Sequence, residues 1–169
     1  MKVVFSHGKE SGPWGSKISK LAERASSAGF AVDSIDYTDS SDPEQRVLKL
    51  QRYLQAETQP YLLVGSSMGG YVSLVAAQST QPVAVFLLAP ALYMPGYQQQ
   101  QYSSDIEQLQ IVHGWSDTVI PVAHSIKFAQ QAKCSLHLID SDHRLNSSLT
   151  QVIELFDIFL ARHSTSCGA

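Results

Sequence analysis

The sequence predicts a single-domain α/β protein, a three-layer α/β/α sandwich with about six mostly parallel strands. Three observations lead to this prediction. Short runs rich in Val, Ile, Leu and Phe recur along the chain, segments with helical periodicity separate them, and the joints between them are short. Several runs are continuously apolar, which is typical of strands covered by helices on both faces. The expected strands are residues 2–7, 31–37, 61–66, 83–90, 109–114 and 135–140.

The first two helices are predicted from their caps and apolar stripes. Gly29 ends the first helix, because glycine readily adopts the left-handed conformation found at helix C-termini. Asp42 can cap the second helix, and Pro43 suits its first turn. The inward stripes are Ile18, Leu21, Ala22 and Ala25 in the first helix and Val47, Leu50 and Leu54 in the second.

Three more helices follow. Residues 69–78 are small or apolar and predict a buried helix. Pro121 opens the next helix, for which we expect an inner face of Ala123, Ile126 and Ala129 or Gln130. The last helix begins after Asn146 and Ser147, and its expected inward residues are Leu149, Val152, Ile153, Phe156 and Leu160. The domain then spans residues 1–162, and the polar residues 163–169 form a frayed tail.

The composition excludes several classes of function. Hydrophobic residues make up 44% and charged residues 16% of the 169 residues, which is a globular balance. The formal net charge of −3, without clusters of lysine or arginine, argues against nucleic acid and anionic membranes as partners. No apolar stretch approaches the length of a membrane span, and the first residues are too polar for a signal-peptide core.

The cysteine content predicts an ordinary cytoplasmic protein with reduced thiols. The two cysteines, Cys134 and Cys167, lie in different contexts and form no metal-type pair. We expect no metal and no cofactor, and the expected partner is a small molecule.

The pentapeptide GSSMG, residues 65–69, predicts a nucleophilic serine at a strand-to-helix turn. In such a turn, the residue two positions before the serine lies close to the residue two positions after it. Side chains there would collide, so both positions require glycine. Gly65 and Gly69 satisfy this spacing around Ser67, whereas Ser66 has no glycines in that register. The Met68 N–H, at the start of the helix, can then point at an oxyanion on the substrate.

A serine hydroxyl needs a base, and histidine is the usual one near neutral pH. Of the six histidines, His143 follows the last expected strand on a loop at the same edge of the sheet as Ser67. His137 lies within a strand and is expected to pack in or beside the sheet. His7 and His113 end strands. Position along the chain therefore favours His143.

The acid that orients the histidine is predicted to be Asp117. It lies just after the strand that ends in His113 and before the helix at Pro121. Asp140 and Asp142 are competitors because they lie near His143 in sequence. A neighbouring carboxylate usually cannot reach the Nδ1 atom of the histidine while its Nε2 faces the serine, which favours Asp117.

The loop after the first strand, SHGKESG, supplies a second expected oxyanion donor. Gly8 permits a tight turn, and the N–H of Lys9 is the expected donor. The glycine patterns of nucleotide-binding loops are absent, so nucleotide binding is set aside.

Four segments together resemble the α/β-hydrolase superfamily, in its small bacterial serine hydrolase or esterase-like branch. They are SHGKESG, VGSSMGG, HGWSDTVIP and DSDHRL. The resemblance runs from Lys2 to about Leu160 and implies a Ser67–His143–Asp117 triad, with backbone donors at Met68 and Lys9. By comparison with larger members of the superfamily, we expect this chain to lack the two amino-terminal strands of the full fold, and only residues 91–108 could cover the site. A reduced fold without a large lid favours small, accessible acyl groups.

The resemblance implies hydrolysis of small acyl esters or thioesters through an acyl-enzyme. Residues that we expect to line the acyl pocket are Trp14, Tyr93, Met94 and Tyr97. Two alternatives stay open. The chain could be a non-catalytic binding or scaffold protein that keeps the fold, or it could perform related acyl chemistry such as peptide hydrolysis or perhydrolysis with the same residues.

Overall fold

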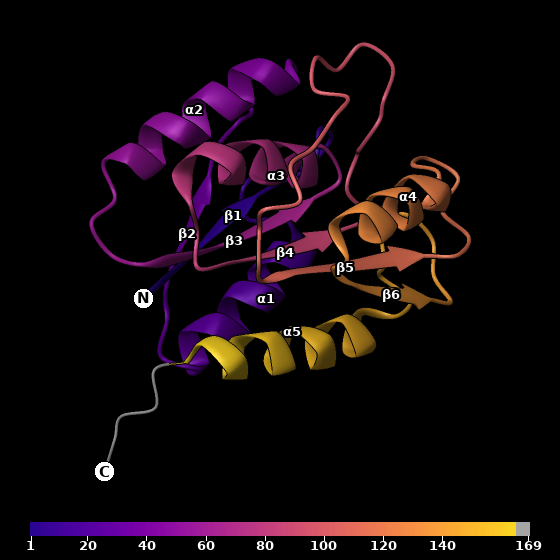
Figure 1. The fold of residues 1–169 in the computed structure, drawn as a ribbon. Helices are drawn as coiled ribbons and strands as arrows, with labels where there is room; N and C mark the ends of the chain where they lie inside the picture. The colour runs from indigo at the N-terminus through magenta and orange to yellow at the C-terminus, as the bar shows by residue number, and fades with distance from the viewer. Residues whose placement is uncertain (165–169) are drawn as a thin grey trace.

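Six strands form one parallel sheet in the computed structural model, which describes residues 1–164 (Figure 1). Their order across the sheet is β2-β1-β3-β4-β5-β6, and every neighbouring pair is parallel. Each strand lies within its predicted range. The strands are β1 (Lys2–Ser6), β2 (Ala31–Ile35), β3 (Tyr61–Ser66), β4 (Ala84–Leu88), β5 (Leu109–Gly114) and β6 (Ser135–Ile139).

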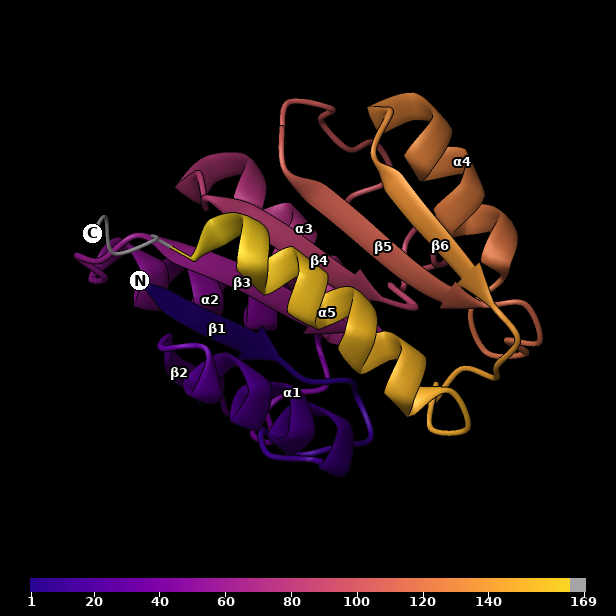
Figure 2. The ribbon, with the colours of Figure 1, turned by 90° about the horizontal axis from the view of Figure 1, so that it is seen from below.

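Helices cover both faces of the sheet, which confirms the predicted α/β/α layers (Figures 1 and 2). One face carries α1 (Ser16–Ser27) and α5 (Leu149–His163), and the other carries α2 (Pro43–Gln55), α3 (Met68–Thr80) and α4 (Val122–Ala132). Each face has its own apolar core. Phe156 of α5 packs against Phe5 and Phe86 of the sheet, whereas Leu50 and Phe128 are fully buried on the opposite face.

The caps and stripes of the first two helices agree with the prediction. All four predicted stripe residues of α1 are buried, and Gly29 follows the helix with a φ of +87°. The Asp42 carboxylate accepts from the Glu44 N–H at the start of α2, with Pro43 in the first turn. Both helices are therefore specified by local sequence as well as by packing.

The inner face of α4 differs from the predicted one. The sequence predicts that Ala123, Ile126 and Ala129 or Gln130 face inward, but only Ala129 among them is buried. Ser125 and Phe128 lie inward instead. The reason is a buried hydrogen bond between the Ser125 hydroxyl and His113 of β5. This bond turns the Ser125 side of the helix towards the sheet, which the positions of the apolar residues alone do not predict.

The last helix buries Val152, Phe156 and Leu160 as predicted, and Phe159 in addition. Leu149 and Ile153 are half-buried against the same core. The helix continues through His163, and the rest of the predicted tail, from residue 165 on, lies outside the described residues. Within residues 1–164, no helix has the length and apolar character needed to span a membrane. The same part of the chain contains no group of three or more metal-ligating side chains.

The order of the strands places the switch point of the sheet between β1 and β3. The chain runs from β1 to β2 on one side and then returns to β3 on the other side of β1. Ser6 pairs with Gly65, so the carboxyl ends of these two strands are neighbours. Open parallel sheets bind ligands at such switch points. The loop at residues 7–15 and the turn at Ser67 meet there.

Candidate active site

Ser67 occupies the turn between β3 and α3 in a strained conformation. Its φ of 57° and ψ of −121° lie where residues other than glycine are rare. A Cβ at position 65 would lie 2.3 Å from the Gly69 carbonyl oxygen, and one at position 69 would lie 2.0 Å from the Ser6 carbonyl oxygen. Both glycines are therefore required by close backbone contact. The Ser67 hydroxyl does not cap the helix that follows it, so it is available to another partner.

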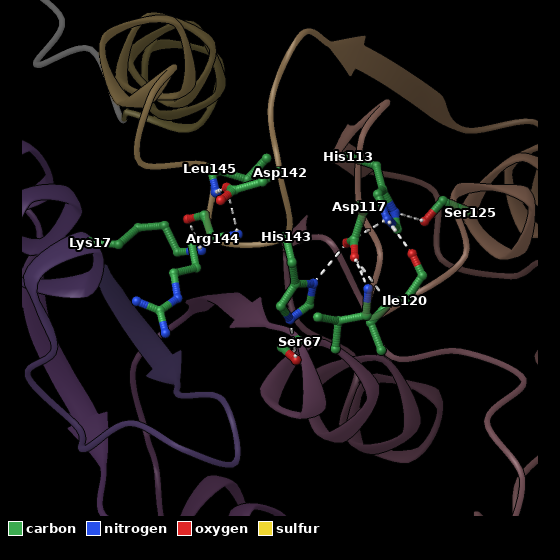
Figure 3. A network of polar contacts seen from close by, with 11 residues as sticks. Lys17, Ser67, His113, Asp117, Ile120, Ser125, Asp142, His143, Arg144 and Leu145 are labelled. Atoms are coloured by element: carbon green, nitrogen blue, oxygen red, sulfur yellow. Dashed lines mark hydrogen bonds and ion pairs between the residues drawn. The ribbon is translucent and has the colours of Figure 1, made fainter.

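Ser67, His143 and Asp117 form a continuous chain of hydrogen bonds (Figure 3). His143 Nε2 lies 3.0 Å from Ser67 Oγ, and His143 Nδ1 lies 2.7 Å from Asp117 Oδ2. These side chains come from the ends of β3, β5 and β6, which the parallel sheet brings to one edge. The His143 side chain is 18% exposed and that of Asp117 is fully buried, so the imidazole is the more accessible of the two groups.

The Asp117 carboxylate is held by four hydrogen bonds. Oδ1 accepts from the N–H groups of Val119 and Ile120, both at 2.8 Å. Oδ2 accepts from His143 and, at 3.0 Å, from His113 Nε2. Burial alone would raise the pKa of Asp117, but the hydrogen bonds from Ile120, His143 and Val119 keep it below its ordinary value. The carboxylate therefore stays ionised beside the imidazole.

His113 is the member of this network that sequence reasoning missed. It is fully buried, and its Nδ1 lies 2.7 Å from the Ser125 hydroxyl. Its Nε2 faces two acceptors, Asp117 Oδ2 and the Ile120 carbonyl, so Nε2 carries the proton and Nδ1 accepts from Ser125. Burial lowers the pKa of His113, which favours this neutral form. The signal available in the sequence was the spacing of four residues between a strand-end histidine and Asp117.

The two competing carboxylates near His143 have other surroundings. Asp142 Oδ1 accepts from the backbone N–H groups of Arg144 and Leu145 and thereby shapes the loop that carries His143 (Figure 3). Asp140 is exposed. Neither carboxylate makes a hydrogen bond to His143 within the described residues. Lys17 of α1 donates to the Arg144 carbonyl oxygen, and burial lowers the pKa of this lysine to about 8.

The two predicted oxyanion donors belong to the turn at Ser67 and to the loop after β1. Met68 begins α3, and its N–H therefore has no acceptor inside the helix. Lys9 lies in the loop after β1. Within residues 1–164 neither N–H donates a hydrogen bond to the protein. Both donors are free to bind a ligand, and their role stays a prediction.

The residues predicted to line an acyl pocket differ in their surroundings. Trp14, in the loop after β1, is 50% exposed. Tyr93 packs edge-on against Tyr102 and lies under the Lys127 ammonium group. Met94 is half-buried, and Tyr97 packs against Tyr71 of α3. Contact of these side chains with a substrate stays a prediction.

The segment after β4 that could cover the site is anchored on the helices instead. The Gln98 N–H donates to Glu44 of α2, and the Gln99 N–H donates to the Tyr71 hydroxyl of α3. Gln131 of α4 donates to the Tyr102 carbonyl oxygen. Residues 91–108 therefore lie against α2, α3 and α4.

Comparison with known proteins identifies the family. Residues 2–151 match the family described as "Uncharacterised protein family (UPF0227)". The chain belongs to this family. A search of the curated proteins found no match.

Solved structures similar to this UPF0227 member have the α/β-hydrolase fold. A protein from Xanthomonas campestris pv. campestris, assigned to the α/β-hydrolase superfamily, is 30% identical, with a TM-score of 0.88 over 95% of this chain and 98% of that chain. Est1E from Butyrivibrio proteoclasticus is 20% identical, with a TM-score of 0.80 over 95% and 87% of the two chains. An α/β serine hydrolase without a lid, also from Xanthomonas campestris, is 17% identical, with a TM-score of 0.73 over 98% and 84%. The predicted reduced α/β-hydrolase fold is thus confirmed.

Proposed function

We propose that the protein is a serine hydrolase that cleaves small acyl esters or thioesters. The observation that carries this proposal is the hydrogen-bonded chain from Ser67 Oγ through His143 to Asp117 Oδ2, at a strained turn on the carboxyl edge of the sheet. A nucleophile, a base and an orienting acid in this order support acyl transfer. A cytoplasmic location, which the sparse cysteine content favours, is part of the same proposal.

The acylation step follows from the tautomer of His143. The ionised Asp117 only accepts hydrogen bonds, so His143 Nδ1 carries the proton and Nε2 presents its lone pair to the Ser67 hydroxyl. Nε2 takes the hydroxyl proton as Oγ attacks the acyl carbon, and the carbonyl oxygen becomes an oxyanion. We assign the N–H groups of Met68 and Lys9 as its donors. Collapse of this intermediate breaks the bond to the alcohol or thiol, which leaves with the proton from Nε2.

Deacylation repeats these steps with water as the nucleophile. His143 Nε2 takes a proton from water as the water oxygen attacks the acyl carbon of the Ser67 ester. The proton then returns to Ser67 Oγ as the acid is released. Asp117 stabilises the transient imidazolium in both halves of the reaction and keeps its own charge throughout.

The test of the proposal is turnover of p-nitrophenyl esters of increasing chain length, alongside a thioester and a peptide substrate. We expect short acyl esters or thioesters to be preferred over long chains and peptides. The Ser67→Ala variant should lose about three or more orders of magnitude in kcat while unfolding at the same urea concentration as the wild type. Equal turnover by both proteins would contradict the proposal.

A fluorophosphonate probe separates an enzyme from a scaffold that has kept the fold. The probe phosphonylates an activated serine, so the wild type should be labelled and the Ser67→Ala variant should not. Ser66→Ala is the matched control, because Ser66 is adjacent in sequence and lies outside the hydrogen-bonded chain; this variant should label like the wild type. No labelling of the wild type, or equal labelling of all three proteins, would favour a binding protein without catalysis.

A further inference from the structure

A buried arginine lies beneath the loop that carries one of the assigned oxyanion donors. Arg46 of α2 is only 2% exposed. Its Nε donates to the Ser40 carbonyl oxygen at 2.7 Å, and its Nη1 donates to the carbonyl oxygens of His7 and Gly8 at 3.4 Å and 3.2 Å. Within residues 1–164 no carboxylate forms an ion pair with it, although Asp39 and Glu10 act on its charge from farther away, and the centre of the Tyr37 ring lies 5.3 Å from its guanidinium carbon.

A buried cation that no carboxylate contacts directly is costly. Backbone carbonyl oxygens, an aromatic face and the more distant carboxylates of Asp39 and Glu10 stabilise the Arg46 guanidinium, but no carboxylate contacts it directly. A positive charge of this kind stabilises a negative charge that develops nearby, and it does so more strongly in a buried setting than in water. Arg46 therefore ties the loop after β1 to α2, and its charge is also placed to stabilise an anion that forms nearby.

The carbonyl group of Gly8 sets the direction of the Lys9 N–H. The two belong to one peptide group, and the described chain contains no cis peptide bond. In a trans peptide the N–H points opposite to the C=O. Because the Gly8 oxygen is held on the side of Arg46, the Lys9 N–H points away from that side.

His7 holds the same carbonyl oxygen. Its Nε2 accepts from the Tyr37 N–H at 3.0 Å, so Nδ1 carries the proton and donates to the Gly8 oxygen at 2.7 Å. Burial lowers the pKa of His7, which keeps this neutral tautomer at neutral pH. The Ser11 hydroxyl also donates to this oxygen, at 3.4 Å, so three side chains fix one peptide plane.

This peptide lies beside the nucleophile. A Cβ built on Gly8 would be 3.5 Å from the Cβ of Ser67 and 3.7 Å from the Ser66 carbonyl oxygen. The space between the Gly8–Lys9 peptide and Ser67 is where the carbonyl oxygen of a bound acyl group becomes negative under the proposed function.

We propose that Arg46 is a positioning residue of the oxyanion hole. Arg46 holds the Gly8–Lys9 peptide by donating to the Gly8 carbonyl oxygen, so that the Lys9 N–H points towards the oxyanion. Its charge also polarises that peptide, which strengthens the N–H as a donor. This inference rests on the proposed serine hydrolase activity, and it assigns to α2 a part in stabilising the transition state.

The test compares Arg46→Met with Arg52→Met in hydrolysis of p-nitrophenyl acetate. Arg52 lies on the same helix six residues on and is exposed, so it is the matched control. We expect Arg46→Met to lower kcat about tenfold with KM within about twofold of the wild type. This is less than the reduction of about 10²- to 10³-fold that is typical for loss of an oxyanion donor, because the Lys9 N–H is kept and His7 still holds the Gly8 carbonyl oxygen. Arg52→Met should stay within about twofold in both constants.

A transition-state analogue distinguishes positioning from a merely structural role. A trifluoromethyl ketone forms a tetrahedral adduct with the serine and places its oxyanion where that of the substrate develops. Its affinity should fall in Arg46→Met by the same factor as kcat/KM. An unchanged affinity, or unchanged kcat, would overturn the inference. If wild type and Ser67→Ala turned over ester equally, the proposed function itself would fail, which is a separate result.

Arg46→Lys and Arg46→Ala cover the case in which Arg46→Met does not fold. Arg46→Lys keeps the charge but loses the planar guanidinium, and we expect it to retain more activity than Arg46→Ala. Added guanidinium chloride at millimolar concentration should raise the activity of Arg46→Ala several-fold and leave the wild type unchanged. Equal activity of the Lys and Ala variants, without rescue by guanidinium, would overturn the inference.

Discussion

His113 donates from Nε2 to Oδ2 of Asp117, the same oxygen that contacts His143 Nδ1. The buried imidazole thus fixes the carboxylate from the side opposite to the candidate base. Two donors on one oxygen, with two backbone donors on the other, leave the carboxylate one orientation. The position of His143 therefore depends on a residue that does not touch Ser67.

Replacing His113 with Phe should reduce both stability and turnover. The variant removes one donor to Asp117 and leaves the buried Ser125 hydroxyl without its partner, which costs about 1–3 kcal/mol of unfolding free energy. We expect kcat to fall about tenfold, as the carboxylate becomes less firmly held. Urea unfolding and ester kinetics measure the two effects.

Ser125→Ala is the control for that variant. It removes the outer hydrogen bond but leaves the donation from His113 to Asp117 in place, so kcat should stay within about threefold of the wild type. A His113→Phe protein with the stability and the kcat of the wild type would show that the buried imidazole does not support the site.

Asp117→Asn should abolish most activity without unfolding the protein. The amide oxygen will face the N–H groups of Val119 and Ile120, because these are donors, and the NH2 group will face His143. His143 must then accept at Nδ1 and carry its proton on Nε2, where it cannot take the proton of Ser67. We expect kcat to fall by about 10³- to 10⁴-fold.

The matched controls are Asp140→Asn and Asp142→Asn. Asp140 is exposed, and Asp142 hydrogen-bonds its own loop, so the first should be neutral and the second should act mainly on stability. The assignment of the acid would be wrong if Asp117→Asn were harmless and Asp140→Asn were not.

The protein should lose stability as the pH falls below about 6.5. Burial lowers the pKa of both His7 and His113 in the folded state, so the unfolded chain binds more protons in this range. Their contribution is fully present above about pH 6.5 and is lost as the pH falls towards their folded pKa values. The pKa of Asp117 is also lowered, but its contribution is lost only below about pH 3.9.

Urea unfolding between pH 5 and pH 8 measures this dependence. The free energy of unfolding should decline from about pH 6.5 downwards in the wild type, and the decline should be smaller in His7→Gln and His113→Gln. A free energy that is constant across this range in the wild type would contradict buried neutral histidines.

The parts of the site that could be predicted from sequence are those encoded by backbone geometry. The glycines around Ser67 identify a close approach of two chain segments, and this constraint is readable without knowing what packs nearby. Asp117 and His143 follow strands, and parallel strands bring their carboxyl ends to one edge. The sequence therefore predicts the fold and which residues meet.

The parts that could not be predicted depend on side-chain partners across elements. A serine counts as polar, so the inward position of Ser125 becomes clear only once His113 is seen beside it. An arginine on a helix is expected to be exposed, and nothing local marks Arg46 as lying under the carbonyl groups of another loop. Such contacts join residues far apart in the chain, and the periodicity of apolar residues in the sequence does not predict them.

Gly65→Ala and Gly69→Ala should each cost more than about 3 kcal/mol of unfolding free energy, or prevent folding. A methyl group at either position would lie 2.3 Å or less from a backbone carbonyl oxygen, and backbone atoms cannot rotate aside as a side chain can. Gly12→Ala is the matched control, because no heavy atom lies within 4 Å of a Cβ there, and its stability should stay within about 0.5 kcal/mol of the wild type. Urea unfolding of the three variants measures the difference. Wild-type stability in Gly69→Ala would mean that α3 does not approach the end of β1 as closely as described, and the presentation of Ser67 at this turn would need another explanation.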